Sequence, residues 1–390
     1  MSRQAMIVGA GLTEVGKVYG RTAREFAADA VRRAVADAGM TLGDVDGLLI
    51  NARGGTDLNL GLAKALNLRD LRMLAEVNAF GASAALMVSQ AANAVLSGEA
   101  EVVVCVFADD PLKPAGDTGA AYRKSSSTAT GFRSAETASG FTSVNHRYAL
   151  AASRYMSTYG VTQDQFGAVA VSQRAWAVDN PVATMRTPMT LEDYHSSRWI
   201  VEPLHLFDCC LVSNGGAAIV ITTPERAADT PRPSVAIAGW AQSHPGYSWE
   251  RGSDFGLVTG AAQAGPAALA MAGLKPGDID VREIYDCYTY TMLVTLEDYG
   301  FCDKGEAGAL AASGALAPGG ALPTNTGGGQ LSSYYLWGMT PLMEAIDQLR
   351  GVAGVRQVDR YATAIVSGNG GLLDHHGTVV LGAPEQGWEK

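Results

Sequence analysis

The sequence predicts an α/β protein built from two related halves, and three observations support that prediction. Segment 38–46 recurs as 272–280, an offset of 234 residues, and each copy joins the end of an amphipathic helix to an apolar strand. A second helix-glycine-strand pattern, at 83–108, recurs at 342–367. Strands that alternate with helices are typical of buried strands sandwiched between helix layers. The polar, proline-containing segment 223–233 divides the two halves.

The N-terminal half opens with an apolar strand at 5–8, followed by Gly9 and Gly11. A dinucleotide-binding turn would need a third glycine three positions after Gly11 and an immediate helix. Position 14 is Glu14, and the helix pattern starts only near Thr22. We therefore interpret the glycine pair as a turn at the end of the strand.

The remaining elements follow in order along the chain. Glycines just past the helix patterns, at Gly39, Gly98, Gly273 and Gly351, suit left-handed helix ends. A long excursion at 110–200 is predicted either to cover a site or to form an oligomer contact. The predicted strands are 47–50, 102–108, 283–285 and 362–367, and the further predicted helices are 83–97, 145–159, 162–178 and 342–350.

Composition narrows the class of protein. Of 390 residues, 47% are hydrophobic and only 17% are charged, and 46 are glycine, which suggests a closely packed oligomer. The net charge of −10 argues against nucleic-acid binding through a basic surface. The excursion is an exception, because residues 111–200 hold nine Lys or Arg and six Asp or Glu. An anionic small molecule is best received there.

The chain shows no sign of secretion or of membrane insertion. Its five cysteines are odd in number and form no CxxC pair, which fits a reducing cytoplasm better than disulfides or a zinc site. The first residues lack a signal-peptide pattern, and the longest strongly apolar run, 102–108, is far too short to span a bilayer.

Common cofactor motifs are also missing. The glycine runs 327–329 and 368–371 are not followed by the Lys-Ser/Thr of a phosphate-binding loop. The triplet Asp374, His375 and His376 has no further ligand at metal-binding spacing. We expect no metal and no covalently bound cofactor.

Several blocks, taken in order, resemble the thiolase superfamily, specifically its sterol-carrier and lipid-transfer branch. Residues 285–288 (YDCY) match that branch's His-Asp-Cys-Phe block, and 296–302 (LEDYGFC) follow as in the branch. Residues 325–329 (NTGGG), 208–217 (DCCLVSNGGA) and 367–371 (SGNGG) resemble three further blocks. The resemblance covers nearly the whole chain. It implies a five-layer αβαβα sandwich of two βαβαβαββ halves, placed here at 1–225, excursion included, and 232–390.

The departures from the thiolase pattern define the expected chemistry. Ala79, in the turn 78–83, falls at or within one residue of the acylated cysteine's place, so no thiol is available there. Ser367 falls at the second, acid/base cysteine. Tyr335 replaces the histidine of the Gly-His-Pro motif, and Tyr285 falls at a second polar position that faces the enolate. Acyl transfer through a covalent thioester therefore lacks its nucleophile.

A retro-aldol cleavage needs no protein nucleophile, and it matches these substitutions. A base removes the β-hydroxyl proton, the Cα–Cβ bond breaks, and the electrons rest on a thioester enolate that is then protonated. Tyr285 and Tyr335 suit the two proton-handling roles, in either assignment, although a tyrosine base needs a lowered pKa. The predicted substrate and oxyanion region also includes Ala79, Phe80, Asn325, Gly328, Gly329, Ser367 and Asn369, with the amides of Ala79 and Asn369 as oxyanion donors.

This pattern resembles most the lipid-transfer-protein aldolases of steroid side-chain degradation. That resemblance implies cleavage of a 17-hydroxy steroid side-chain CoA ester to a ketone and a short acyl-CoA such as propionyl-CoA. It also implies a homodimer with an OB-fold, zinc-bearing partner domain from a hydratase subunit. Coenzyme A enters as part of the substrate, and Arg123, Lys124 and Arg133 are candidates to bind its phosphates.

Two other functions stay open at this point. One is an acyl-CoA acyltransferase that uses Cys287 or Ser367, and the other is a non-catalytic scaffold that binds lipid-CoA. Structural roles also remain open for both tyrosines, since Tyr335 could pack on Trp337 and Phe80, and Tyr285 could fill core.

Overall fold

The structure is a computed structural model that describes residues 4–53, 56–116, 118, 121–122, 134–135, 138–141, 143–246 and 252–388. Its strands are β1 (Met6–Leu12), β2 (Gly47–Asn51), β3 (Met73–Glu76), β4 (Val102–Asp109), β5 (Trp199–Val201), β6 (Leu204–His205), β7 (Gly215–Thr222), β8 (Val235–Ser243), β9 (Val281–Glu283), β10 (Thr363–Gly370) and β11 (His375–Gly382). Its helices are α1 (Ala23–Asp37), α2 (Leu62–Ala65), α3 (Ser83–Ser97), α5 (Val144–Tyr159), α6 (Gln163–Val178), α7 (Leu191–Ser196), α8 (Pro224–Ala227), α9 (Ala261–Ala272), α10 (Thr289–Asp298), α11 (Ala307–Ala312) and α12 (Met339–Leu349).

The strands show the duplication directly. One hydrogen-bonded sheet runs in the order β3-β2-β4-β7-β1-β8-β11-β10-β9. In the first half β2 is parallel to β3 and β4, and β7 is antiparallel to β4 and β1. The second half repeats these directions, with β9 parallel to β10 and β11 antiparallel to β10 and β8. The halves join where Met6 lies opposite Ala236.

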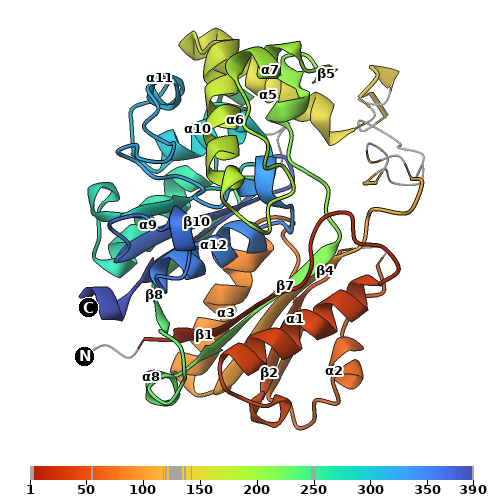
Figure 1. Ribbon diagram of the computed structural model, residues 1–390, viewed down its shortest axis with the longest axis vertical. Helices are drawn as coiled ribbons and strands as arrows, with labels where there is room; N and C mark the ends of the chain where they lie inside the picture. Colours follow the sequence, from red (N-terminus) through yellow and green to blue (C-terminus); the bar gives the residue numbers. More distant parts are fainter. Residues whose placement is uncertain are drawn as a thin grey trace.

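The helices complete five layers, as the resemblance implied. The buried helices α3 and α12 share one apolar core with the inward faces of both half-sheets. On the outer faces, α1 packs on β1 and β7, and α9 packs on β8 and β11. Figure 1 shows α3 and α12 near the middle of the molecule, with α1 and α9 outside them. By length and hydropathy alone Phe80–Ser97 could cross a membrane, but 72% of it is buried inside the protein.

The predicted helix ends are confirmed. Gly39, Gly98, Gly273 and Gly351 all have φ between 68° and 77°, a region that glycine enters without steric cost. In both halves a short 3₁₀ turn follows, at Leu42–Asp44 and Pro276–Asp278, capped by the carboxylates of Asp44 and Asp278. The 234-residue offset therefore holds at the level of single hydrogen bonds.

The interpretation of Gly9 and Gly11 as a turn is wrong. Both glycines lie inside β1. A Cβ at Gly9 would overlap the carbonyl oxygen of Ala34, and one at Gly11 that of Ala30. The glycines are there because α1 packs directly on the strand, which a local sequence pattern does not reveal.

The strand predicted at 283–285 lies two residues earlier, as β9, so Tyr285 stands in the loop between β9 and α10. The excursion also has an unexpected place, because it lies within the N-terminal half in sequence but packs on the other half. Its helix α6 contacts α10, α11 and the π-helical turn Gly329–Ser333. Figure 1 shows α5, α6 and α7 at one end of the molecule beside α10, far from both chain termini.

Candidate active site

The two tyrosines predicted from sequence meet. The hydroxyl oxygens of Tyr285 and Tyr335 are 3.1 Å apart. Tyr285 is buried and Tyr335 is partly buried. Each is fixed at its backbone by a buried serine, since the Tyr285 N–H donates to Ser367 Oγ at 2.8 Å and the Tyr335 N–H to Ser213 Oγ at 3.0 Å. Two separate loops thus present one hydrogen-bonded pair of phenols.

Burial keeps both phenols protonated. Desolvation is the largest cause that raises the pKa of Tyr285 and of Tyr335 well above 10. The neighbouring Cys287 raises the pKa of Tyr285 further, while the hydrogen bond between Tyr285 and Tyr335 lowers it. The condition set for a tyrosine base, a lowered pKa, is not met in the unliganded protein, so the phenols act here as neutral hydrogen-bond donors.

A tight turn from β3 to α3 forms one wall of the site. Phe80 stands at its tip with φ of 53° and is 47% exposed, whereas Ala79 is buried. The Ala79 N–H, a predicted oxyanion donor, donates to Ser83 Oγ at 2.7 Å. The residues of this turn are Asn78, Ala79, Phe80, Gly81, Ala82 and Ser83, so whichever one matches the thiolase cysteine, the turn carries no thiol.

The same turn recurs in the second half and faces the first. Trp337 has φ of 49°, and the Leu336 N–H donates to Thr340 Oγ1 at 2.9 Å, just as Ala79 does to Ser83. The ring centroids of Phe80 and Trp337 lie 6.1 Å apart. Trp337, rather than Tyr335, therefore packs on Phe80, which leaves the Tyr335 hydroxyl to Tyr285.

Glycines allow the turn from β3 to α3 to lie directly against the Tyr285 phenol. A Cβ at Gly81 would overlap both the Tyr285 hydroxyl and the carbonyl oxygen of Asn369. A Cβ at Gly368 would lie 2.6 Å from the Gly81 carbonyl oxygen, and one at Gly370 would overlap that of Ala79. The end of β10 therefore lies directly on the turn, with Asn369 beside the Tyr285 phenol.

Three of the predicted site residues form the frame of the site. The Asn325 side chain accepts from the Ile284 N–H at 2.6 Å and donates to the Ile284 carbonyl at 2.8 Å, which fixes the strand end before Tyr285. A Cβ at Gly328 would overlap Ala177, at 2.5 Å, and one at Gly329 would overlap the Asp286 carboxylate. Both glycines have positive φ. These residues hold the two tyrosine loops rather than donate into the space beside the phenols.

Asp286 links those two loops. It accepts from the N–H groups of Gln330, at 2.9 Å, and Leu331, at 3.3 Å, in the turn that leads to Tyr335. Burial raises its pKa to about 7, although these hydrogen bonds oppose the shift. Asp286 is therefore a strut between the segments that carry Tyr285 and Tyr335.

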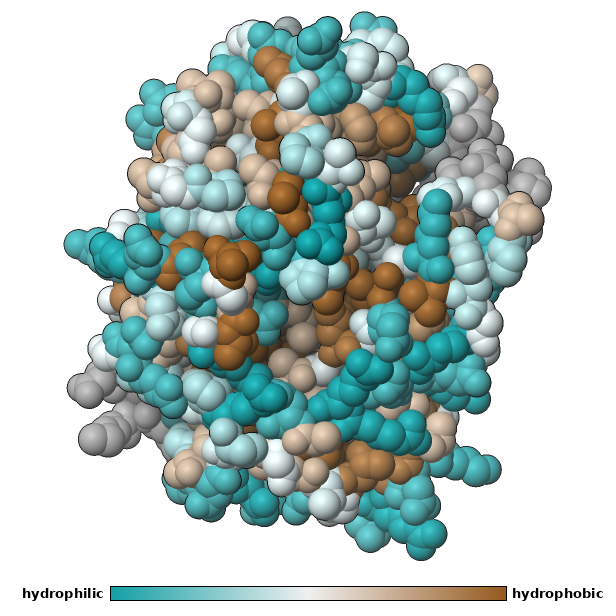
Figure 2. Space-filling view, viewed as in Figure 1, coloured by the Kyte–Doolittle hydropathy of each residue, from teal (hydrophilic) through white to brown (hydrophobic). Residues whose placement is uncertain are grey.

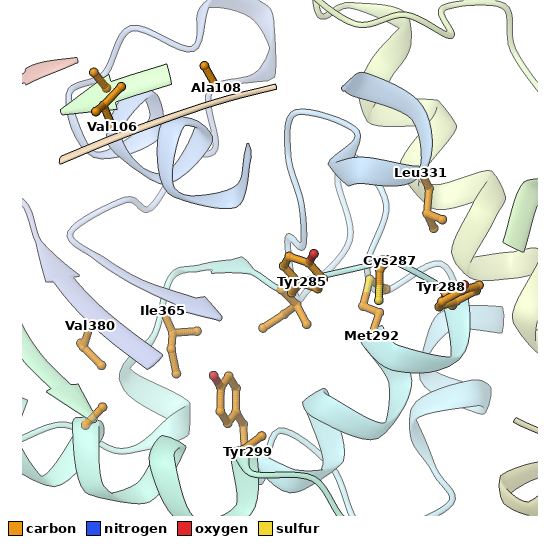
Figure 3. Packing of buried hydrophobic residues seen from close by; sticks show 14 of the residues in the cluster. Val106, Ala108, Tyr285, Cys287, Tyr288, Met292, Tyr299, Leu331, Ile365 and Val380 are labelled. Carbon is orange, nitrogen blue, oxygen red and sulfur yellow. The ribbon is translucent and has the colours of Figure 1, made fainter. Parts of the chain in front are cut away.

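Cys287 is poorly suited to be a nucleophile. It is buried, and burial raises the pKa of its thiol to about 12. In Figure 3 it lies beside Met292 within the hydrophobic packing, while the Tyr285 hydroxyl points away from the Tyr299 ring. Ser367 is already used as the acceptor for the Tyr285 N–H.

The excursion covers this region. Tyr148 on α5 packs on Tyr288, with ring centroids 4.4 Å apart, and its hydroxyl donates to the Gly371 carbonyl at 2.9 Å. The excursion's predicted role as a site cover matches this placement. The proposed phosphate contacts Arg123, Lys124 and Arg133 lie outside the described residues. Among the residues that are described, no group of three or more His, Cys, Asp or Glu could hold a metal ion.

Sequence reasoning missed a polar chain behind Tyr335. The fully buried Asp109 accepts from Arg53 Nε at 2.8 Å and from the Tyr122 hydroxyl at 3.3 Å. The Tyr122 ring stands edge-on to Tyr335 with centroids 6.3 Å apart, and the Arg53 guanidinium lies 5.4 Å from the Tyr122 ring centre. A carboxylate at the end of the apolar strand 102–108 was the available signal. Arg53 also lines an open pocket of about 470 Å³ with Asp110 and Lys113.

The face shown in Figure 2 is mostly hydrophilic, and apolar side chains gather around a hollow near its middle, over the region where Figure 1 places α3 and α12.

The fold and the site together define a thiolase-type protein without the thiolase cysteine. The family model for the thiolase N-terminal domain matches residues 5–225, and that for the thiolase C-terminal domain-like family matches 241–383. The chain belongs to the thiolase superfamily. The human mitochondrial 3-ketoacyl-CoA thiolase, solved in complex with CoA, shares the fold with a TM-score of 0.71 at 16% identity, over 98% of each chain.

The relatives of higher identity are lyases. A steroid side-chain-cleaving aldolase of Thermomonospora curvata is 38% identical over 379 residues, which cover 94% of this chain and 95% of that one. A 17-hydroxy-3-oxo-4-pregnene-20-carboxyl-CoA lyase of Mycobacterium tuberculosis is 37% identical, over 92% and 96%. The solved structure of an Ltp2-ChsH2(DUF35) aldolase matches with a TM-score of 0.87 at 38% identity, over 97% and 98%.

Proposed function

We propose that this protein is an aldolase that cleaves a β-hydroxyacyl-CoA by a retro-aldol reaction, without a covalent acyl-enzyme. The observation that carries the proposal is the pair of touching phenols, Tyr285 and Tyr335, beside a turn that offers no thiol. The two relatives of high identity are named as an aldolase and a CoA lyase, which supports the same reaction class.

The neutral phenol pair suggests how the proton moves. The reaction carries one proton from the β-hydroxyl to Cα as the Cα–Cβ bond breaks and the hydroxyl carbon becomes a ketone. One phenol takes the hydroxyl proton while it passes its own to the second phenol, which passes its own to the enolate carbon. Each phenol ends the cycle neutral, so neither needs a lowered pKa. Either tyrosine can stand at the hydroxyl end.

The substrate we propose is a 17-hydroxy steroid side-chain CoA ester, with a 17-ketone and a short acyl-CoA such as propionyl-CoA as products. Names of both high-identity relatives refer to steroid substrates, which supports this choice. Coenzyme A enters only as part of the substrate. The phosphate contacts proposed for it remain Arg123, Lys124 and Arg133.

We propose that the working assembly is a homodimer with an OB-fold, zinc-bearing partner domain. The solved relative named as an Ltp2-ChsH2(DUF35) aldolase supports such a partner. Strand β3 lies at the edge of the sheet, and Leu74 on it is 41% exposed. An exposed apolar edge strand is a ready contact for a second copy. The five free cysteines are consistent with a cytoplasmic protein.

The decisive experiment mixes the purified full-length chain, with its partner subunit, and a β-hydroxyacyl-CoA that bears a tertiary alcohol. We expect a ketone and a shortened acyl-CoA in equal amounts with no free CoA added. A strict requirement for free CoA would mean thiolysis and would overturn the aldolase proposal. Binding without any turnover would instead favour a lipid-CoA scaffold.

A further inference from the structure

Asn369 lies near the end of β10, beside the Tyr285 phenol. It stands two residues after Ser367, so both side chains point to the same face of the strand. On that face the Ser367 hydroxyl oxygen accepts a hydrogen bond from the Tyr285 N–H. The Asn369 carbonyl and the Tyr285 hydroxyl both border the space that a methyl group at Gly81 would fill. Asn369 is therefore an immediate neighbour of the Tyr285 phenol.

The side chain of Asn369 is buried and has no partner. It is 4% exposed, and neither its Oδ1 nor its Nδ2 has a hydrogen-bond partner within the described part of the chain. Leaving a buried amide unsatisfied costs about 1–3 kcal/mol. A buried amide left unpaired in this way calls for an explanation, and a role toward the substrate is one.

The residue opposite Asn369 is polar as well. His376 on β11 pairs with Asn369 across the ladder. Its Nε2 lies 2.8 Å from the Tyr299 hydroxyl, while its Nδ1 has no partner among the described residues. Burial lowers the pKa of His376 to about 3, so the ring is neutral. Asn369 and the residue opposite it are thus both uncharged, which suits a carbonyl oxygen that becomes an enolate oxygen.

We propose that the Asn369 side-chain amide donates a hydrogen bond to the thioester oxygen of the substrate and stabilises the enolate. This deepens the aldolase proposal and rests on it. The role differs from that predicted from sequence, which invoked the main-chain amide of Asn369. No proton is transferred: the electron pair of the broken Cα–Cβ bond moves onto the thioester oxygen, and the Nδ2–H donor, held away from water, interacts most strongly when the charge is there.

The test isolates enolate formation from carbon–carbon cleavage. In D₂O the phenols relay a Cα proton of propionyl-CoA to a solvent molecule in the place of the ketone oxygen, and the relay returns a deuteron to the enolate. Mass spectrometry follows this exchange of the Cα hydrogens without any steroid. We expect Asn369→Ala to slow the exchange by about 100-fold or more, the usual loss of one oxyanion donor. Thr363→Val, at the far end of β10, is the matched control and should exchange at the wild-type rate.

A second measurement separates this role from a structural one. The Asn369 side chain forms no hydrogen bond with the residues that the structure describes, so Asn369→Ala and the larger Asn369→Leu should melt at the wild-type temperature or above it. A structural role predicts a fall of several degrees. Wild-type protein should also bind propionyl-CoA more tightly than the thioether in which a methylene replaces the carbonyl, and the variants should lose this preference.

The outcomes distinguish the two proposals. If the wild-type protein neither exchanges propionyl-CoA nor cleaves a β-hydroxyacyl-CoA, the aldolase proposal fails. If the wild-type protein does both and Asn369→Ala stays within twofold of it, only the role of Asn369 fails. Slow exchange in Asn369→Ala together with a lowered melting temperature in both variants would also overturn that role.

Discussion

The proposed proton relay depends on two hydroxyl groups, those of Tyr285 and Tyr335, that already form a hydrogen bond. In a relay, removal of either hydroxyl breaks the path from the β-hydroxyl to Cα. We expect Tyr285→Phe and Tyr335→Phe each to lower kcat by about 100-fold or more. Residues that act as a unit have non-additive effects. The double variant should therefore be about as slow as either single one, as measured by ketone formation, whereas a further 100-fold loss would mean two independent roles.

The raised pKa values set the direction of the pH dependence. The relay needs both phenols neutral, and burial holds their pKa values above 10. Activity should therefore stay level from about pH 7 to 9 and fall only as the pH rises through the raised phenol values, above about 10. The measurement is kcat/KM for cleavage against pH. A rise in activity between pH 7 and 9 that disappears in Tyr335→Phe would indicate a phenolate base and would contradict the relay.

Some residues of the candidate site could be predicted from the sequence, and others could not. Tyr285 and Tyr335 were found because each replaces a known family residue within a recognisable block. Asn325, Gly328 and Gly329 lie in such blocks too, but only three-dimensional contacts show that they brace loops. The unpartnered side chain of Asn369 and the buried carboxylate of Asp109 depend on strand register and on distant partners, which no local pattern encodes.

At the scale of elements, the turn from β3 to α3 sets the position of the phenols. Gly81→Ala would place a methyl group against Tyr285 and against the Asn369 carbonyl. We expect a loss of about 1–3 kcal/mol in stability from overpacking, and a drop of about 100-fold in kcat because the phenol is displaced.

The control for this variant is Gly277→Ala, since a Cβ there meets nothing within 4 Å. It should leave both melting temperature and kcat unchanged. A Gly81→Ala variant as active as this control would show that the turn does not position Tyr285.

The polar chain from β4 supports Tyr335 from behind. Asp109→Asn removes the charge that pairs with Arg53 and weakens the acceptor for the Tyr122 hydroxyl. We expect a loss of about 1.5–3 kcal/mol in stability, the range for hydrogen bonds to charged groups, and a lower kcat with little change in KM. Thermal melts and cleavage kinetics check both.

Asp110→Asn is its matched control, because Asp110 pairs with Lys113 near the surface, where ion pairs contribute little. Equal effects from the two variants would argue that Asp109 has no special relation to the site.

Most helices and strands could be predicted from the sequence, and the wrong predictions have a common cause. The helix α3 was predicted with its observed bounds, and α5 and α6 within one residue, because helical periodicity and caps are local signals. The errors at Gly9, Gly11 and 283–285 arose where a neighbouring helix or strand decides the outcome. Close packing of α1 on β1 requires the glycines, and pairing with β10 fixes where β9 ends.

At the scale of the whole molecule, duplication explains why the site lies at its centre. Each half contributes a turn with one left-handed residue, Phe80 or Trp337, and the two turns face each other. The turn of the first half therefore forms a wall of the site, and the segment that leads into the turn of the second half carries Tyr335. The excursion from the first half covers the loops of the second, so a complete site requires both halves folded together.

The same arrangement predicts how the protein responds to thiol reagents. Burial raises the pKa values of Cys287 and Cys302 to about 12 and those of Cys105, Cys209 and Cys210 beyond the usual range, so thiolates are scarce at neutral pH. A thiolase that works through a covalent thioester loses its activity when its cysteine is alkylated. Here we expect iodoacetamide at pH 7.5 to leave cleavage intact, and intact-mass spectra taken during turnover to show only the unmodified chain. Rapid inactivation that Cys287→Ser prevents, or an acyl group trapped on the protein, would show that the chain kept the covalent route despite its altered turn.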